Sequence, residues 1–297
     1  LDAYLYEQPE LKAALDRDDE LREMARSPLV LRLFTIAFAG LGEATGRLHE
    51  LDGGDLRDAI FETYVQRRFA HEKLKRHIHI DYTLDRIEQV LGRMAMENAA
   101  GMHLSLPAWS ENVLTIDDFA RVLSEINVQP FIEQGIQLNL LTTTDRHAVR
   151  FVHRMLRDYF AFGYALAHLD DESLYATGRN PAAALAALAD ARAVPALRQA
   201  LYHDDPRIRA GAVQALGRIG DESTVQALTR AVSDPDPDVA RSAVIALGRL
   251  GVAAIPALLD IRRSPRGELL PIAADALMNL ANHDAVPVLL DALHDPS

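Results

Sequence analysis

The segments GAVQALGRIGD (residues 211–221) and SAVIALGRLG (242–251) are closely similar and lie 31 residues apart. A second set of matching segments recurs at nearly the same period in the opposite phase: AVPAL (193–197), TVQAL (224–228), AIPAL (254–258) and AVPVL (285–289). Self-similarity at a period of 20–50 residues is typical of stacked repeats. The last third of the chain is therefore predicted to be an array of two-helix units.

Within each predicted unit, a short turn separates the two helices. Asp205-Pro206, Asp236-Pro237 and Asp295-Pro296 fall at this point of the period. Proline is tolerated in the first turn of a helix because the amide hydrogen it lacks would have no partner there, and the preceding aspartate can cap the free amides. Each unit is thus predicted to be helix, Asp-Pro turn, helix.

The second helix of each unit alternates small and apolar residues. In the first quoted segment, Ala212, Ala215 and Gly217 are small enough to let a neighbouring helix approach, and Leu216 contributes to an apolar stripe. One unit cannot bury that stripe alone, whereas a stack of units can, which predicts an α-solenoid. NPAAALAALAD (180–190), one period earlier, fits the second helix of a degenerate unit.

The first 172 residues show no such period but contain several helix boundaries. In RSPLVLRLFTIAFAG (26–40), Ser27 is a cap, Pro28 takes the first helical position and Gly40 ends the helix. Further helices are predicted over LRDAIFETYVQRRFAHEKL (56–74), from Thr83 to Gly101, and after Thr115.

The segment RFVHRMLRDYF (150–160) joins two different patterns. Before His153, apolar and polar residues alternate with period two, as in a half-buried strand; after it, apolar residues recur at helical spacing. With LNLLTTTDRH (138–147) before it, this predicts two short strands and then a helix. The expected fold is mainly α: a small helical domain (1–50), a winged-helix-like domain with a small β-hairpin (51–172) and a solenoid (173–297).

The order of these segments resembles a known family. ELREMARSPLVLRLF (20–34), LRDAIFETYVQRRF (56–69) and RFVHRMLRDYFAFGYAL (150–166) resemble the region that follows the nucleotide-binding core in NACHT-type signal-transduction NTPases of the STAND class. The repeats resemble HEAT repeats of the short, alanine-rich type also found in phycobilin lyases. The resemblance implies a nucleotide-switched signalling protein, with a further domain expected before Leu1.

The resemblance assigns roles to two residues. It implies that Pro28 packs beside the adenine and that His153 reaches the phosphates, holding ADP in a closed, inactive state. A helix start also presents free amides to an anion, which favours this role for His153 independently. The alternatives are a helix-start proline and a capping or core histidine. ADP or ATP with Mg²⁺ is expected in the longer protein, as are oligomerisation on activation and a role in defence.

A phosphate-binding loop is absent from the sequence. No G-x-x-x-x-G-K-[ST] occurs in the 297 residues, and GLGEATGR (40–47) has the wrong spacing and no lysine. This fragment is therefore predicted to have no catalytic residues of its own and to bind no nucleotide tightly. An upstream nucleotide-binding core would have to supply the phosphate-binding loop and the catalytic residues.

Arginines on the second helices of the repeats are the candidate partner-binding surface: Arg207, Arg218, Arg241 and Arg249. The alternative is an ordinary solvated face. The formal net charge is −12, and residues 1–172 carry 29 acidic against 19 basic residues, compared with 14 and 12 in the remainder. A nucleic-acid binder usually has the opposite balance. A protein partner is therefore expected. The chain has no apolar run long enough to span a membrane, and its lack of cysteine favours the cytoplasm as its location.

Three other groups of residues are candidates for chemistry. A metal could be bound by three histidines, His71, His77 and His79. The pairs His71-Glu72 and His49-Glu50 are similar to those of di-iron HEAT hydroxylases, but both pairs lie outside the repeats. The acidic runs 18–20 and 170–172 adjoin predicted helix ends and favour solvated surface. We predict no metal site; the main alternative function is a constitutive protein-binding scaffold with no nucleotide.

Overall fold

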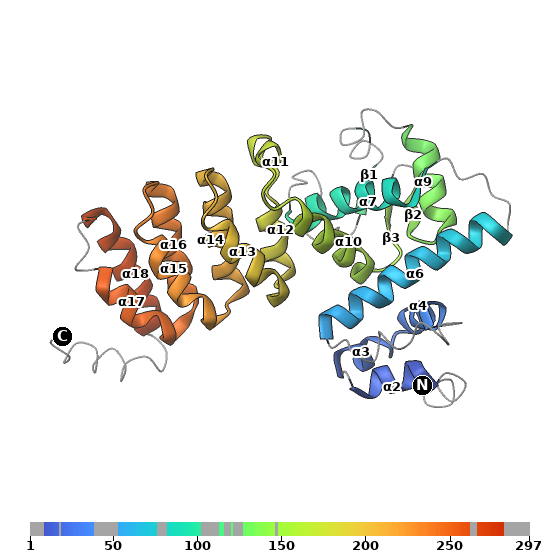
Figure 1. The fold of residues 1–297 in the computed structure, drawn as a ribbon, viewed down its shortest axis with the longest axis horizontal. Helices are drawn as coiled ribbons and strands as arrows, with labels where there is room; N and C mark the ends of the chain where they lie inside the picture. The colour runs from blue at the N-terminus through green and yellow to red at the C-terminus, as the bar shows by residue number, and fades with distance from the viewer. Residues whose placement is uncertain are drawn as a thin grey trace. The chain divides into compact units, whose positions relative to one another are not determined.

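The computed structural model describes residues 9–17, 19–38, 53–75, 82–101, 113–115, 120, 127–145, 148–261 and 266–281 (Figure 1). Most of these residues are helical, so the prediction of a mainly α fold is confirmed. Contacts divide the chain into two compact units, residues 1–95 with 106–160, and residues 96–105 with 161–297. The predicted domain boundaries at residues 50 and 172 stay predictions.

The first unit is built from helices and one small sheet. Its helices are α2 (Pro9–Arg17), α3 (Asp19–Met24), α4 (Pro28–Phe38), α6 (Gly53–Lys75), the larger part of α7 (Leu84–Ala99), α9 (Val128–Gln137) and the start of α10 (Arg154–Ala167). As predicted, α4 begins at Pro28, and α7 follows Thr83, whose hydroxyl accepts a hydrogen bond from the amide of Arg86 at 3.3 Å. Helix α9 was not predicted.

The core of this unit gathers aromatic side chains around α6. Phe61 and Tyr64 are fully buried. The Tyr64 hydroxyl donates to the carbonyl of Asn139 at 3.2 Å and accepts from its side-chain amide at 3.0 Å. Asn139 has a φ of 57°, a left-handed conformation that asparagine tolerates better than most residues. This pair fixes the end of α9 against α6.

The sheet has three antiparallel strands in the order β1-β3-β2: β1 (Val113–Thr115), β2 (Leu141–Asp145) and β3 (Ala148–Phe151). The hairpin β2-β3 confirms the two strands predicted between residues 138 and 153. Strand β1 was missed because three residues are too few to show a period-two pattern. Helix α10 follows β3 directly, so the predicted change from strand to helix at His153 is confirmed.

The second unit contains the repeat array, whose helices follow one another in chain order in Figure 1. Beyond the end of α10, its elements are α11 (Glu172–Ala176), α12 (Pro181–Leu188), α13 (Val194–Ala200), α14 (Pro206–Ile219), α15 (Val225–Ala231), α16 (Pro237–Arg249), α17 (Ile255–Asp260) and α18 (Leu270–Ala281). Helices α14 and α16 are the two predicted second helices, and α12 is that of the predicted degenerate unit.

The first helices α13, α15 and α17 are each entered through a short 3-10 turn, a detail that the period did not reveal. These turns are η2 (Ala191–Ala193), η3 (Glu222–Thr224) and η4 (Gly251–Ala254), and a further turn, η6 (Gly267–Leu269), leads into the second helix α18. Asp190 and Asp221 cap the first two by accepting hydrogen bonds from backbone amides. The hydrophobic core of the array is rich in alanine.

Several predicted features lie outside the described residues. They are Gly40, the helix after Thr115, the segment 285–289, Asp295-Pro296, and the histidines His49, His77 and His79. Among the helices that the structure describes, none combines the length and the apolar character needed to cross a bilayer.

Candidate functional site

The second helices of the array pack directly on one another through glycine and alanine. A Cβ built on Gly217 of α14 would lie 2.6 Å from the Cβ and 2.7 Å from the Cα of Ala246 on α16. A Cβ on Gly248, one period later, would lie 2.9 Å from the Cβ of Ala276. Helices in contact without intervening side chains lie near the lower end of the usual separation of ~8–10 Å. The spacing of successive second helices is therefore set by these contacts.

The Asp-Pro turns fix where each second helix begins. The Asp205 carboxylate accepts a hydrogen bond from the amide of Arg207 at 2.8 Å, and the Asp236 carboxylate accepts from the amides of Asp238 and Val239 at 2.9 and 3.1 Å. These bonds satisfy amides that have no partner within the helix. Because α14 and α16 begin at the same point of the repeat, residues 31 positions apart occupy the same place on the two helices.

A buried ion pair joins the two turns. The Arg209 guanidinium of α14 donates to both carboxylate oxygens of Asp234 at 2.8 and 2.9 Å, and also to the carbonyls of His203 and Asp204, each at 2.8 Å. Only 12% of the Arg209 side chain and 9% of the Asp234 side chain are exposed. Such bidentate pairs are geometrically specific. This pair holds adjacent repeats in register.

Burial alone would raise the pKa of Asp234, but hydrogen bonds from Arg209 and from the amide of Asp236 outweigh it and hold the pKa below its ordinary value. The carboxylate is therefore ionised at neutral pH, as the pairing with Arg209 requires.

An exposed row of side chains follows from this regular packing. We call it the second-helix face, and it consists of Gln214 and Arg218 on α14 and Arg241, Ile245 and Arg249 on α16. Within each helix the members are four residues apart, and so lie on one side of it. Gln214 and Ile245 are equivalent in the two repeats, as are Arg218 and Arg249.

The two helices of this face also touch at its edge. The side-chain amide of Gln214 donates to the Ser242 hydroxyl at 3.4 Å, a long and weak hydrogen bond.

The three guanidinium groups of this face are unpaired: no ion pair or hydrogen bond joins the side chain of Arg218, Arg241 or Arg249 to another part of the described chain. Ile245 lies between two of them and is 43% exposed. Arg207 differs, because its guanidinium forms an ion pair with the carboxylate of Asp205. Three of the four predicted arginines therefore share one surface with free charges, and Arg207 supports its own turn.

Ile245 was missed in the sequence because an isoleucine on a repeat helix is expected in the core. The signal that could have found Ile245 is its spacing: it lies four residues from Arg241 and four from Arg249, on the polar side of α16.

The two predicted nucleotide residues lie on different elements of the first unit. His153 immediately precedes α10, and its Nδ1 accepts a hydrogen bond from the amide of Met155 at 3.2 Å. Pro28 is exposed at the start of α4. Among the described residues, no hydrogen bond joins His153 to α4. His153 thus caps the start of α10 and Pro28 begins α4, and the nucleotide-binding role of both residues stays a prediction.

Burial lowers the pKa of His153, against an opposing effect of the Asp158 carboxylate. The imidazole is neutral at pH 7, which agrees with Nδ1 acting as the acceptor of the cap. Nε2 then carries the proton and is a hydrogen-bond donor.

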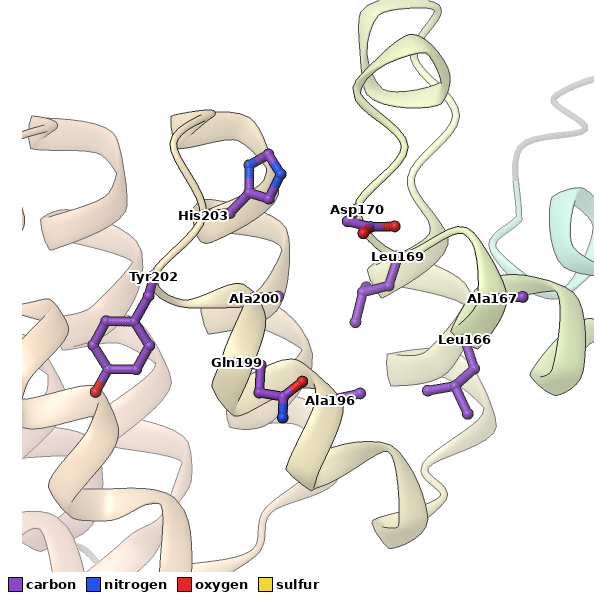
Figure 2. Close-up of a pocket in the computed structure, with 9 residues that line it drawn as sticks. All are labelled: Leu166, Ala167, Leu169, Asp170, Ala196, Gln199, Ala200, Tyr202 and His203. Carbon is purple, nitrogen blue, oxygen red and sulfur yellow. The ribbon is translucent and has the colours of Figure 1, made fainter.

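A depression of about 460 Å³ lies at the beginning of the array, between the end of α10 and α13 (Figure 2). Leu166, Leu169, Ala196 and Ala200 are among its apolar lining residues. In Figure 2 the ring of His203 extends toward the side on which Asp170 lies. The ring of Tyr202, by contrast, points away from the other labelled side chains.

His203 occupies the position that Asp234 takes in the next repeat. Its Nδ1 accepts a hydrogen bond from the amide of Asp205 at 3.0 Å, as the Asp234 carboxylate accepts from the amide of Asp236 at 2.9 Å. One period before Arg209, however, the chain has Gly178. The ion pair therefore has no counterpart at the start of the array, where the imidazole lines the depression instead.

Metal chemistry receives no support from the described residues, which contain no group of three or more histidine, aspartate or glutamate side chains placed to hold an ion. Of the predicted alternatives, His71 lies exposed on α6. Asp171 of the acidic run caps α11 by accepting from the amide of Ser173 at 3.0 Å. That run has a structural role.

Comparison with known proteins supports the repeat assignment. The family described as HEAT repeats matches residues 165–244 and 229–297, so the match begins within α10 and covers the array. No curated protein matches the chain. The last 133 residues are HEAT-type repeats, whereas the likeness of residues 10–170 to NACHT-type proteins stays a prediction.

Proposed function

We propose that the HEAT-type array is a protein-binding scaffold and that the second-helix face is its binding surface. The observation that carries the proposal is an exposed isoleucine that shares one face with three arginines for which the described residues offer no partner; two of these arginines, Arg218 and Arg249, are equivalent in adjacent repeats. HEAT-type repeats are helical scaffolds suited to protein interaction. This face concentrates charge and apolar surface at fixed spacing.

The composition of the face suits an interface. Arginine is enriched among the residues that dominate binding energy, and an apolar side chain at the centre of an interface is shielded from water by polar neighbours. The glycine contacts and the Arg209–Asp234 pair already fix the spacing of α14 and α16. A rigid surface loses little conformational entropy on binding, which favours affinity.

A site-specific photo-crosslinker tests this proposal. It would replace Ile245 on α16 in one variant and Val252 of η4 in another; these side chains are 43% and 42% exposed, so the two positions are matched in accessibility. We expect irradiation in cells that make the protein to yield a discrete crosslinked partner from position 245 and little from 252. Equal crosslinking from both positions would contradict the proposal.

A second candidate function is the nucleotide switch that the resemblance implies, with His153 holding ADP in a closed state and partner binding opening it. The supporting observation is the cap: because Nδ1 accepts the Met155 amide, the proton of the neutral ring is on Nε2, at a helix N-terminus that favours anions. A switch of this kind requires the partner to bind the two states with different affinities, typically by ~1–3 kcal/mol.

Two variants at one position test the switch in the intact protein. His153→Asn keeps a capping acceptor but removes the imidazole, and His153→Ala removes both. We expect both variants to release a fluorescent ADP analogue faster than the wild type. Release at the wild-type rate from both would refute the role of His153, and partner binding unaffected by ADP or ATP would leave a constitutive scaffold.

A further inference from the structure

We infer that the second-helix face binds an extended acidic peptide whose pattern is acidic-x-apolar-x-acidic, laid along α16. The inference rests on the proposed function and names the partner chemistry of the same surface. It is drawn from the spacing of three side chains and from the charges around them.

The spacing along α16 matches an extended chain. Arg241, Ile245 and Arg249 are each four residues apart, which at 1.5 Å per residue places them about 6 Å apart along the helix. In an extended peptide, residues i, i+2 and i+4 point to the same side and are about 6.6 Å apart. A carboxylate can therefore reach each guanidinium while the apolar residue between them contacts Ile245.

The neighbouring helix supplies a second set of contacts. Arg218 is equivalent to Arg249 and lies one helix spacing away, where it adds a third positive charge beside the peptide. Gln214 and Ser242 have only their long mutual hydrogen bond among the bonds described for their side chains. An extended peptide has unpaired amides and carbonyls that these groups can bind, whereas the backbone of a helical partner is already internally bonded.

The charges favour an acidic protein segment over nucleic acid. The chain carries a net charge of −12, which would repel a polyanion over its whole length. Two or three carboxylates placed at the arginines avoid most of this repulsion, because charges farther than about 8–10 Å are screened at physiological ionic strength. The central isoleucine has no role in binding a phosphate backbone but suits an apolar side chain.

Fluorescence anisotropy with defined peptides tests the inference. The probe is fluorescein-labelled Gly-Ser-Glu-Thr-Leu-Thr-Glu-Ser-Gly, compared with a peptide of the same composition in which the two glutamates are adjacent and with one in which lysine replaces glutamate. The protein is the full 297-residue chain at low salt. We expect only the first peptide to bind appreciably, and its binding to weaken as salt is added.

Charge-reversal variants locate the binding. Arg241→Glu and Arg249→Glu should each weaken binding on the order of tenfold or more, because each replaces an attraction with a repulsion. Arg230→Glu is the matched control: this arginine is exposed on α15 of the same repeat, outside the face, and its reversal should change affinity less than about twofold.

Each other result overturns the inference in a recognisable way. Equal binding of the two acidic peptides would refute the spacing, and equal loss in Arg230→Glu would show a general charge effect. Tighter binding of single-stranded oligothymidylate with the same arginine dependence would identify nucleic acid instead. If no peptide binds up to about 1 mM, the acidic pattern is wrong. A crosslink from position 245 would then still stand, and the protein-binding proposal with it.

Discussion

Gly217→Ala tests whether contact between second helices sets the structure of the array. The added Cβ would lie 2.6 Å from the Cβ and 2.7 Å from the Cα of Ala246, whereas ordinary contacts between such atoms are about 3.5–4.0 Å. Because one of the two atoms belongs to the backbone, no side-chain rotation relieves the overlap. The substitution therefore requires α14 and α16 to move apart by roughly 1 Å.

Two opposing effects determine the size of the change. Forcing an extra methyl into a packed interior usually costs about 1–3 kcal/mol. Alanine is also the better helix former than glycine by about 1 kcal/mol. We therefore expect Gly217→Ala to lower the free energy of unfolding by about 1 kcal/mol, with the steric cost exceeding the gain in helix propensity.

A matched control separates the two effects. Gly163 lies in the exposed face of α10, and a Cβ built on it meets no atom within 4 Å. Gly163→Ala gains the helix propensity alone, so it should be stabilising by up to about 1 kcal/mol. Gly248→Ala, whose Cβ would meet only the Cβ of Ala276 under 3.0 Å, should fall between the two variants.

Urea denaturation followed by circular dichroism measures the three variants, and hydrogen exchange measures the protection of the α14 and α16 amides. Exchange is needed because repeat arrays can open locally without unfolding as a whole. The expected order of stability is Gly163→Ala, Gly248→Ala, Gly217→Ala, from highest to lowest. If Gly217→Ala is as stable as Gly163→Ala, with unchanged protection of α16, close helix contact does not set the array spacing.

Three further predictions concern single side chains, each measured by urea denaturation. Arg209→Leu leaves the Asp234 carboxylate in a mostly buried site without its partner and should cost about 3 kcal/mol. Because the pKa of Asp234 is held below its ordinary value, its contribution is present above pH ~4 and lost as pH falls, a dependence that Asp234→Asn should flatten. His153→Ala should cost about 1 kcal/mol through loss of the cap, and His153→Asn much less. Because burial lowers the pKa of His153, the wild type should lose stability as pH falls below ~6.5, whereas His153→Asn should lose less. Ala189→Gly should raise stability by up to about 1 kcal/mol, since Ala189 ends α12 with a φ of 52°; no gain would show that the left-handed alanine is unstrained.

The sequence predicted those parts of the fold that depend on local chemistry. Pro28, Thr83 and the Asp-Pro turns identified helix starts because proline and capping residues act on the adjacent amides alone. The change from period two to helical spacing located the start of α10 at His153. The pairing of strand β1 with β3 and the Tyr64–Asn139 contact were not predicted, since both join residues far apart in the chain.

The candidate surface was predicted only in part for the same reason. Arginines on the second helices could be counted in the sequence, but their partners could not. Arg207 is paired within its own turn, Arg209 reaches across to the next repeat, and Arg218 has no partner in the part of the chain that the structure describes. These three arginines lie on one helix, and the positions of Asp205 and Asp234 distinguish them.

The segment Leu-Gly-Arg, present in both second helices, links packing to binding. In α14, Leu216 is buried in the core, Gly217 contacts the next helix, and Arg218 is exposed on the second-helix face. The same three positions recur in α16, so the glycine that brings the helices together is always followed by an arginine on the exposed side. The distance between successive guanidinium groups is consequently tied to the closest helix separation that the backbone allows, about 8–10 Å. A bulkier residue at the glycine would therefore alter the spacing of the charges as well as the stability of the array.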